Sequence, residues 1–229
     1  MDRIYQPHLP DLSAVIAVAA DLPMFLGQPL TARVLGAERA CFDRYLRILD
    51  SIETHSLIDP SLLDIGCANG FFSYLLAVTT CRQVTAVDDA RASSCGYSDN
   101  AFLEPLRQTQ REHGLEHLEI VGAPVEQFLS EHPGRQWDIV LCLSVLHHFY
   151  TGYGDHTDTG RLTDEQRVSV FRAIGQATRS VLFLEVDHGR VPESFVPEFA
   201  ELAGFKSVDP IGSSASAVGD TRVLFELWK

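Results

Sequence analysis

A carboxylate beside a glycine-bearing turn is the pattern in this 229-residue chain that most directly suggests ligand chemistry. Asp64 precedes the turn, and a helical pattern follows it. The turn reads Gly66, Cys67, Ala68, Asn69 and Gly70. Glycine permits a sharp reversal and a close backbone approach, and a helix N-terminus attracts electronegative groups. The pattern therefore predicts a ligand cradle at residues 64–70.

The residues of this turn do not match two common nucleotide-binding motifs. A dinucleotide fingerprint needs glycine at its first, third and sixth positions, which here hold Gly66, Ala68 and Phe71. The phosphate loop of ATP-binding proteins needs Gly-Lys-Ser/Thr, which is absent. An acid before the turn suits a cationic or hydroxyl-bearing ligand and opposes pyrophosphate.

A second acid ends the next apolar run, about 20 residues past the turn, where a carboxylate bonds ribose hydroxyls in nucleotide-binding sheets. This residue is Asp88, with Asp89 beside it as a second candidate. A carboxylate accepts two hydrogen bonds from a vicinal diol. A solvated acid at a strand end is the alternative, and the correctly placed turn argues against it.

Three further residues are candidates for proton transfer or acceptor binding: His147, His148 and Glu185. Imidazole accepts a proton near neutral pH, and we rank His147 slightly ahead of His148 because neighbouring side chains point different ways. A purely structural role for the pair is the alternative. Asp187, His156 and His188 could complete an oxygen and nitrogen metal site, but no ligand spacing matches a known signature, so we expect no metal.

The elements that must position these residues alternate between strand and helix from residue 61 to residue 204. Apolar runs at 62–65, 83–87, 118–121, 137–143 and 181–185 predict strands, and segments 71–78, 101–113, 125–132, 163–178 and 193–203 predict helices. Two closely spaced strands, at 206–209 and 222–228, end the chain. This predicts an open α/β sheet of about seven strands, with helices on both faces and an antiparallel edge.

The N-terminal residues predict a helical addition. Leu35, Cys41, Phe42, Leu46 and Leu49 lie on one helical stripe, and residues 12–22 form another apolar segment. We expect residues 1–56 to be a cap or lid and residues 57–229 to be the main domain, with a loop insertion near 149–162. Thr163 and Gln166 predict a capping box after that loop.

Composition restricts the partners. The net charge is −13, which repels phosphate backbones and anionic lipid. The longest apolar stretch near the start is too short to span a bilayer, and its flanks are poor for a signal peptide. The odd set of five cysteines fits reduced thiols better than disulfides or zinc. We therefore expect a cytoplasmic protein without a membrane partner, either monomer or homodimer.

Three segments together resemble the class I S-adenosylmethionine-dependent methyltransferases. They are the run from Leu62 to the Gly66–Gly70 turn, the run ending in Asp88, and the run from Trp137 through Ser144 to His148. The resemblance implies a Rossmann-like, mostly parallel sheet with an antiparallel last strand. It also implies S-adenosylmethionine as cofactor.

The resemblance assigns places to the remaining candidate residues. Asp64 and the turn would face the methionine part of the cofactor, and Asp88 would hold its ribose. Ala123, Pro124 and Val125 would flank the adenine, and Leu143 and Ser144 would lie beside the sulfonium. Many members have an acid near the position of Ala123, so the contact to the adenine amino group differs here.

The function implied is methyl transfer by in-line displacement to an oxygen, nitrogen or carbon of a small-molecule acceptor. The cofactor carries its own activation, so the protein must mainly orient the acceptor. Two alternatives stay open. One is a methyltransferase acting on RNA, at a terminal phosphate or a base, and the other is a catalytically silent protein that binds the cofactor and regulates a partner.

Overall fold

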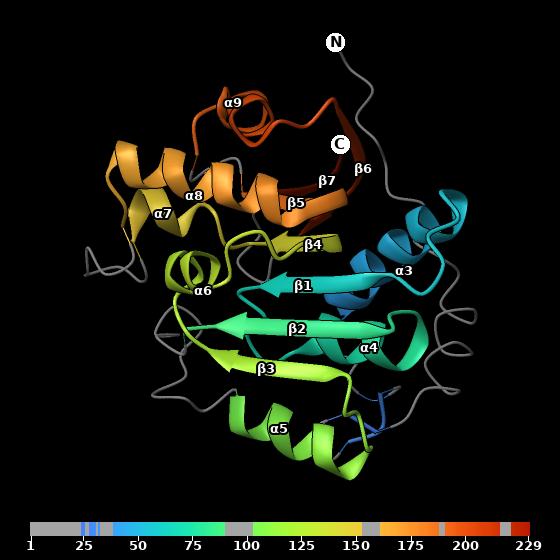
Figure 1. The fold of residues 1–229 in the computed structure, drawn as a ribbon. Coiled ribbons are helices and arrows are strands. Elements are labelled where there is room, and N and C mark those ends of the chain that lie inside the picture. Colours follow the sequence, from blue (N-terminus) through green and yellow to red (C-terminus); the bar gives the residue numbers. More distant parts are fainter. Residues whose placement is uncertain are drawn as a thin grey trace.

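Seven strands form one sheet at the centre of the computed structural model (Figure 1). The structure describes residues 24, 25, 28–30, 32, 39–89, 103–152, 161–187, 191–215 and 221–229. The strands are β1 (Ser61–Ile65), β2 (Gln83–Asp88), β3 (Leu118–Gly122), β4 (Trp137–Leu143), β5 (Thr178–Asp187), β6 (Ser207–Ala215) and β7 (Thr221–Trp228). Their order is β3-β2-β1-β4-β5-β7-β6, and β7 runs antiparallel to both of its neighbours while the other pairs are parallel. The predicted sheet is confirmed.

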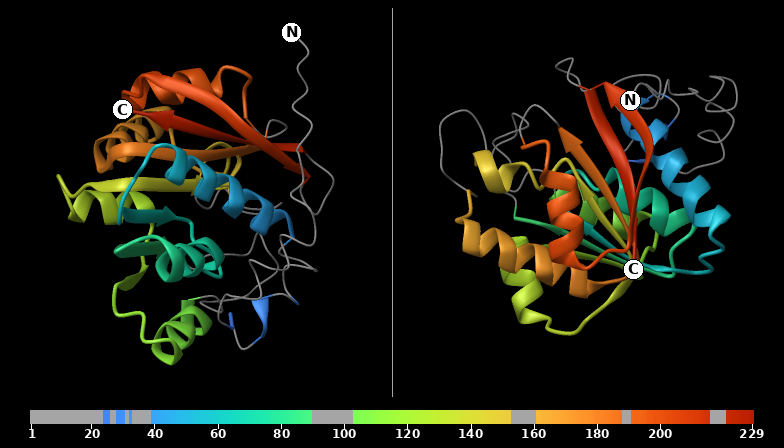
Figure 2. Two further views of the ribbon diagram at one scale, coloured as in Figure 1. Left: turned by 90° about the vertical axis from the view of Figure 1, so that its right-hand side faces the viewer. Right: turned by 90° about the horizontal axis from the view of Figure 1, so that it is seen from above.

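Helices cover both faces of this sheet, as Figures 1 and 2 show. The described helices are α3 (Arg39–Thr54), α4 (Phe71–Thr79), α5 (Leu103–Glu112), α6 (Val125–Glu131), α7 (His148–Thr151), α8 (Asp164–Ala177) and α9 (Phe195–Ala203). Side chains of α3, α4 and α5 share one apolar cluster with the sheet, and those of α6, α8 and α9 share the other. The sheet is therefore buried on both sides, which explains why its strands are continuous apolar runs.

Local sequence signals set several helix ends. Thr163 caps α8, and the capping box with Gln166 is present as predicted. Gly204 ends α9 in the left-handed conformation. Gly175 of α8 lies against α9 so closely that a Cβ there would be 2.0 Å from the carbonyl oxygen of Ala203. This close approach fixes how the two helices cross.

The structure differs from the predicted elements in three places. The short helix α7 occupies the start of the segment predicted to be a loop at 149–162. Strands β5 and β6 are longer than predicted. Strand β5 begins where Thr178 pairs with Trp137 of β4 and ends where Asp187 pairs with Arg222 of β7, and β6 pairs with β7 as far as Ala215. The N-terminal stripe forms α3, which shares an apolar cluster with β1 through Phe42, Tyr45 and Ile48. A lid of residues 1–56 stays a prediction, and residues 12–22 and His156 lie outside the described residues.

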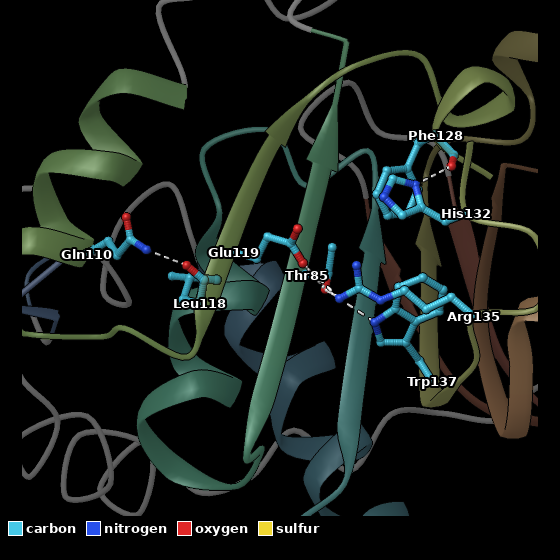
Figure 3. Close-up of polar contacts among 8 residues, drawn as sticks. All are labelled: Thr85, Gln110, Leu118, Glu119, Phe128, His132, Arg135 and Trp137. Carbon is cyan, nitrogen blue, oxygen red and sulfur yellow. Dashed lines mark hydrogen bonds and ion pairs between the residues drawn. The ribbon is translucent and has the colours of Figure 1, made fainter. Parts of the chain in front are cut away.

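Polar contacts tie the strands together near the edge opposite the Gly66 turn. In Figure 3, Arg135 lies across the ring of Trp137 and donates to Glu119 and Thr85. The indole of Trp137 also donates to Thr85, at 3.2 Å. These bonds join β2, β3 and the start of β4. They stabilise the pairing of these strands away from the carboxyl ends of the sheet.

None of the described helices is long and apolar enough to cross a membrane. Four cysteines lie within the described residues, and all four are free thiols: Cys41, Cys67, Cys81 and Cys142. Cys95 lies outside the described residues.

Candidate functional site

The turn after β1 has the backbone conformation that its sequence predicts. Gly66 and Gly70 have φ values of 71° and 76°, which glycine adopts without strain. A Cβ at Gly66 would lie 2.3 Å from Val145, and one at Gly70 would lie 2.4 Å from Leu106. Ala68 also has a positive φ, of 48°, and its backbone N–H donates to Asp88 at 2.9 Å. The second carboxylate therefore holds the turn in shape.

The two acids have different environments. Asp88 is partly exposed at the end of β2. Asp64 is 3% exposed, lies beneath the turn, and accepts a hydrogen bond from the Ser73 hydroxyl at 2.5 Å. Burial raises the pKa of Asp64 to about 7, and the nearby charge of Asp88 adds to that rise, although the Ser73 hydroxyl opposes it. Only Asp88 is placed to touch a ligand directly.

A cavity opens at the carboxyl ends of β1, β2 and β4, where open α/β sheets bind their ligands. It is lined by Ile65, Gly66, Ala68, Val87, Asp88, Asp89, Ala123, Val125, Glu126, Leu143, Ser144, Val145 and His148. The lining thus includes much of the predicted cofactor site, from the turn to the end of β4. Val87, Ala123 and Val125 supply apolar walls, and Asp88 supplies an acceptor for hydroxyl groups.

The remaining predicted cofactor residues lie around the cavity without lining it. Cys67 is buried, and burial raises the pKa of its thiol. Asn69 accepts a hydrogen bond from the backbone N–H of Phe71 at 3.2 Å, and Gly70 and Pro124 stand at the N-terminal ends of α4 and α6. Together with Asp64, these residues belong to the turn and the helix ends that support the cavity wall, but they are not among the residues that line it.

The two neighbouring histidines differ in their position relative to the cavity. His148 lines the cavity, whereas His147 is 4% exposed, lies behind it, and has its ring centroid 4.1 Å from that of His148. His148 Nδ1 lies 3.1 Å from the carbonyl oxygen of Gly152. A carbonyl only accepts, so Nδ1 carries the proton of the neutral ring and Nε2 carries the lone pair. Of the two histidines, His148 is therefore the one that a ligand in the cavity can reach.

Glu185 is a buried member of an ionic group that sequence reasoning missed. Its carboxylate contacts Arg44 of α3 at 2.5 Å and Arg222 of β7 at 3.7 Å. It also accepts a hydrogen bond from Ser144, whose hydroxyl accepts one from Arg222 at 2.6 Å. Ser144 has a positive φ of 59° and lines the cavity, so this group begins at the cavity wall. Its position at the end of the predicted strand 181–185 marked Glu185 in the sequence, but nothing local marked either arginine.

Within the described residues, no group of three or more His, Cys, Asp or Glu side chains is arranged to hold a metal ion. His156 and His188 lie outside the described residues, as does the side chain of Asp187.

A family model described as "Methyltransferase domain" matches residues 63–159. This range contains the Gly66 turn, Asp88 and both histidines. The chain is also 33% identical over 99 residues to the ubiquinone biosynthesis O-methyltransferase of Pseudoalteromonas translucida (strain TAC 125). That match covers 42% of this chain and 36% of the relative, so the chain spans about a third of the length of this curated relative.

Solved structures support the fold. The bifunctional kinase-methyltransferase WbdD superposes with a TM-score of 0.64 at 19% identity, over 95% of this chain and 46% of WbdD. Magnesium protoporphyrin IX methyltransferase from Synechocystis PCC 6803, solved with its cofactor bound, gives 0.57 at 17% identity over 82% of this chain and 81% of its own. The N-terminal domain of EvdMO1, with S-adenosylhomocysteine bound, gives 0.59 at 12% identity over 95% and 94%.

Proposed function

Because this chain carries a class I S-adenosylmethionine-dependent methyltransferase domain, we propose that it transfers a methyl group to a small-molecule acceptor. The observation that carries the proposal is the cavity that joins the Gly66 turn, Asp88 and Ser144 at one edge of the sheet. S-adenosylmethionine is the cofactor of this family, and the chemistry of the cavity suits it. Asp88 is the carboxylate for the ribose hydroxyls, and the apolar side chains of Ala123 and Val125 are suited to the adenine ring.

In this proposal each part of the cavity binds one part of the cofactor. Asp88 accepts hydrogen bonds from the ribose hydroxyls while it also holds the N–H of Ala68. Ala123 and Val125 contact the adenine, and the turn at Gly66 holds the methionine part. Asp64 acts indirectly, because its carboxyl group supports α4 through Ser73 and does not line the cavity.

The cofactor supplies a methyl group made electrophilic by the sulfonium to which it is bonded. The chain's own task is to hold the acceptor's lone pair in line with the breaking bond. Orientation of this kind contributes on the order of 7–11 kcal/mol in favourable intramolecular models. Leu143 and Val145 wall the cavity on either side of Ser144, so they exclude water from the acceptor.

A hydroxyl acceptor fits the cavity best. A hydroxyl must lose its proton as it is methylated, and a positioned base assists that loss. His148 lines the cavity and has its Nδ1 near the carbonyl oxygen of Gly152, whereas Glu185 is held by two arginines and Ser144. We therefore assign the base to His148 and a positioning role to Glu185. The curated relative is by its name an O-methyltransferase, which agrees with a hydroxyl acceptor.

The experiment has two parts. Calorimetry with S-adenosylhomocysteine should give saturable one-to-one binding. Incubation with methyl-labelled S-adenosylmethionine and a fractionated pool of small metabolites should then move the label into a small molecule.

The matched control is Gly66→Val, because the added side chain must collide with Val145 and the residue must keep a positive φ. This variant should neither bind nor transfer. Absence of S-adenosylhomocysteine binding by the wild-type chain contradicts the proposal. Binding with label recovered only in RNA would replace the small-molecule acceptor with a nucleic acid.

A further inference from the structure

We infer that the acceptor carries an oxyanion, a carboxylate or a phosphate, and that Arg222 binds it beside the reacting atom. The inference rests on the proposed function and extends it from a small molecule to an anionic one. It starts from three side chains beyond the end of β4, at the cavity wall formed by Ser144: Arg44, Glu185 and Arg222.

The group is ionic and largely buried. The carboxylate of Glu185 contacts the guanidinium of Arg44 and lies 3.7 Å from that of Arg222. The Glu185 side chain is 0% exposed, and those of Arg44 and Arg222 are 11% and 23% exposed. A buried guanidinium is costly unless its donors are paired, so the hydrogen bonds of Arg222 decide whether the group is complete.

Arg222 has an unused donor. One of its terminal nitrogens donates to Ser144, but no acceptor among the described residues lies within hydrogen-bond distance of its buried Nε–H. The Nε–H and the neighbouring terminal N–H of a guanidinium form a fork that matches two oxygens of a carboxylate or phosphate. A buried N–H without an acceptor is destabilising, and a ligand oxygen removes that penalty.

The position of Arg222 indicates that it binds the acceptor and not the cofactor. The cofactor cradle runs from the Gly66 turn across Asp88 to Val125, and neither arginine lines it. Arg222 stands at the start of β7, which pairs with β5, on the far side of β4 from the cradle. Ser144 lies between the two, since it lines the cavity and accepts a hydrogen bond from Arg222. A ligand bonded to Arg222 therefore approaches the cofactor across Ser144.

The backbone at Ser144 supports this reading. Ser144 has a positive φ, which is strained for a non-glycine residue and persists only where surrounding contacts hold it. Here it aims the hydroxyl at Glu185 and Arg222 at once. Ser144 and Glu185 thus fix the orientation of the guanidinium before a ligand arrives.

The experiment uses the wild-type chain saturated with S-adenosylhomocysteine, so that the cofactor's own carboxylate is already present. Three probes are compared by calorimetry: benzoate, phenyl phosphate and neutral benzamide. We expect at least one of the two anions to bind about tenfold or more tightly than benzamide. Which anion binds more tightly distinguishes a carboxylate acceptor from a phosphate acceptor.

Arg222→Gln tests the assigned residue. It should weaken binding of the favoured anion about tenfold while S-adenosylhomocysteine affinity stays within about threefold, which also shows that the variant is folded. Arg222→Lys keeps the charge but lacks the fork, so it should recover only part of the loss. The matched control is Arg179→Gln, because Arg179 lies at the opposite end of β5 and pairs with Asp138 at 2.6 Å.

Three results would overturn the inference. One is equal binding of the anions and benzamide by the wild-type complex, which needs no variant. Another is a loss of S-adenosylhomocysteine affinity in Arg222→Gln with unchanged anion binding, which would assign Arg222 to the cofactor's carboxylate. The third is anion binding that Arg222→Gln leaves intact. Failure of the wild-type chain to bind S-adenosylhomocysteine contradicts the proposed function itself and is seen before any probe is added.

Discussion

Asp64 and Asp88 are both acids at the carboxyl ends of neighbouring strands, yet burial divides their roles. Asp64 is enclosed and hydrogen-bonded to Ser73, and its pKa is raised to about 7, whereas Asp88 lines the cavity. When the pKa of an acid is higher in the folded state than in the unfolded chain, there is a pH range in which the folded state holds the proton and the unfolded chain does not. Asp64 therefore links the stability of the cradle to pH.

Asp64→Asn tests this link. In the unfolded chain Asp64 ionises near 3.8, and in the folded chain near 7. Between those values the folded state binds the extra proton, so the stability that Asp64 contributes falls as pH rises from about 4 to about 7 and is constant above that. The wild-type free energy of unfolding, measured by urea titration against that of Asp64→Asn, should decline over this window by a few kcal/mol. A difference that does not change with pH would contradict the raised pKa.

Asp88→Asn separates two tasks of one side chain. An amide oxygen still accepts from the N–H of Ala68, but the amide cannot accept both hydroxyls of a ribose. We expect S-adenosylhomocysteine binding to weaken by about 1–3 kcal/mol with the melting temperature little changed. Asp209→Asn, at an exposed residue of β6, is the control and should bind normally. Unchanged affinity in Asp88→Asn would remove Asp88 from the cofactor site.

His148→Gln and His147→Gln form a matched pair, because the rings are neighbours but only His148 lines the cavity. Loss of a general base typically lowers turnover about 10²–10⁴-fold. We expect His148→Gln to lower kcat by about that much, with S-adenosylhomocysteine affinity retained and the acid limb of the pH profile lost. His147→Gln should change stability more than kcat. The reverse pattern would return the base to His147, the residue ranked first from the sequence.

At the scale of helices and strands, the close crossing of α8 and α9 is the most sensitive contact described. A methyl group at Gly175 would collide with the backbone of Ala203, which cannot move as a side chain can. Gly175→Ala should therefore lower the free energy of unfolding by about 1–3 kcal/mol or more, as overpacked cores do. Arg172→Ala, on the exposed side of the same helix, should change it by less than about 0.5 kcal/mol. Equal effects in urea titration would contradict the crossing.

The elements were predictable because each depends on its own residues. Apolar runs such as 137–143 mark strands buried on both faces, and Thr163 with Gln166 marks the start of α8. Helix α7 escaped prediction because four residues are too few to show a period. The extra length of β5 comes from pairing with β4 and β7, and that of β6 from pairing with β7, which no local pattern encodes.

The site was predictable only where its residues follow strands in sequence. The turn, Asp88 and the histidines come directly after strand signals, so topology alone gathers them at one edge. Arg44 and Glu185 are 141 positions apart and meet because α3 packs beside the strands. The direction of Asp64 likewise depends on which face of β1 it occupies, and on Ser73 nine residues later. Contacts of this kind require the folded structure.

For the whole molecule, both apolar clusters share the same sheet, and α3 belongs to one of them. We therefore expect the two to unfold together. Trp137 lies in one cluster and Trp228 packs against the other, so tryptophan fluorescence reports on both faces. In urea titration its midpoint should coincide with that of far-ultraviolet circular dichroism. Separate midpoints would indicate an independent N-terminal unit at residues 1–56.

The place of β7 between β5 and β6 has a consequence for biosynthesis. Among the described strands β7 is the last to be synthesised, and in their sheet it is the strand that pairs with β6 and covers one side of β5. A nascent chain stalled before residue 221 thus exposes an unpaired backbone edge, which recruits other chains. The addition of β7 covers that edge of β5 and pairs β6.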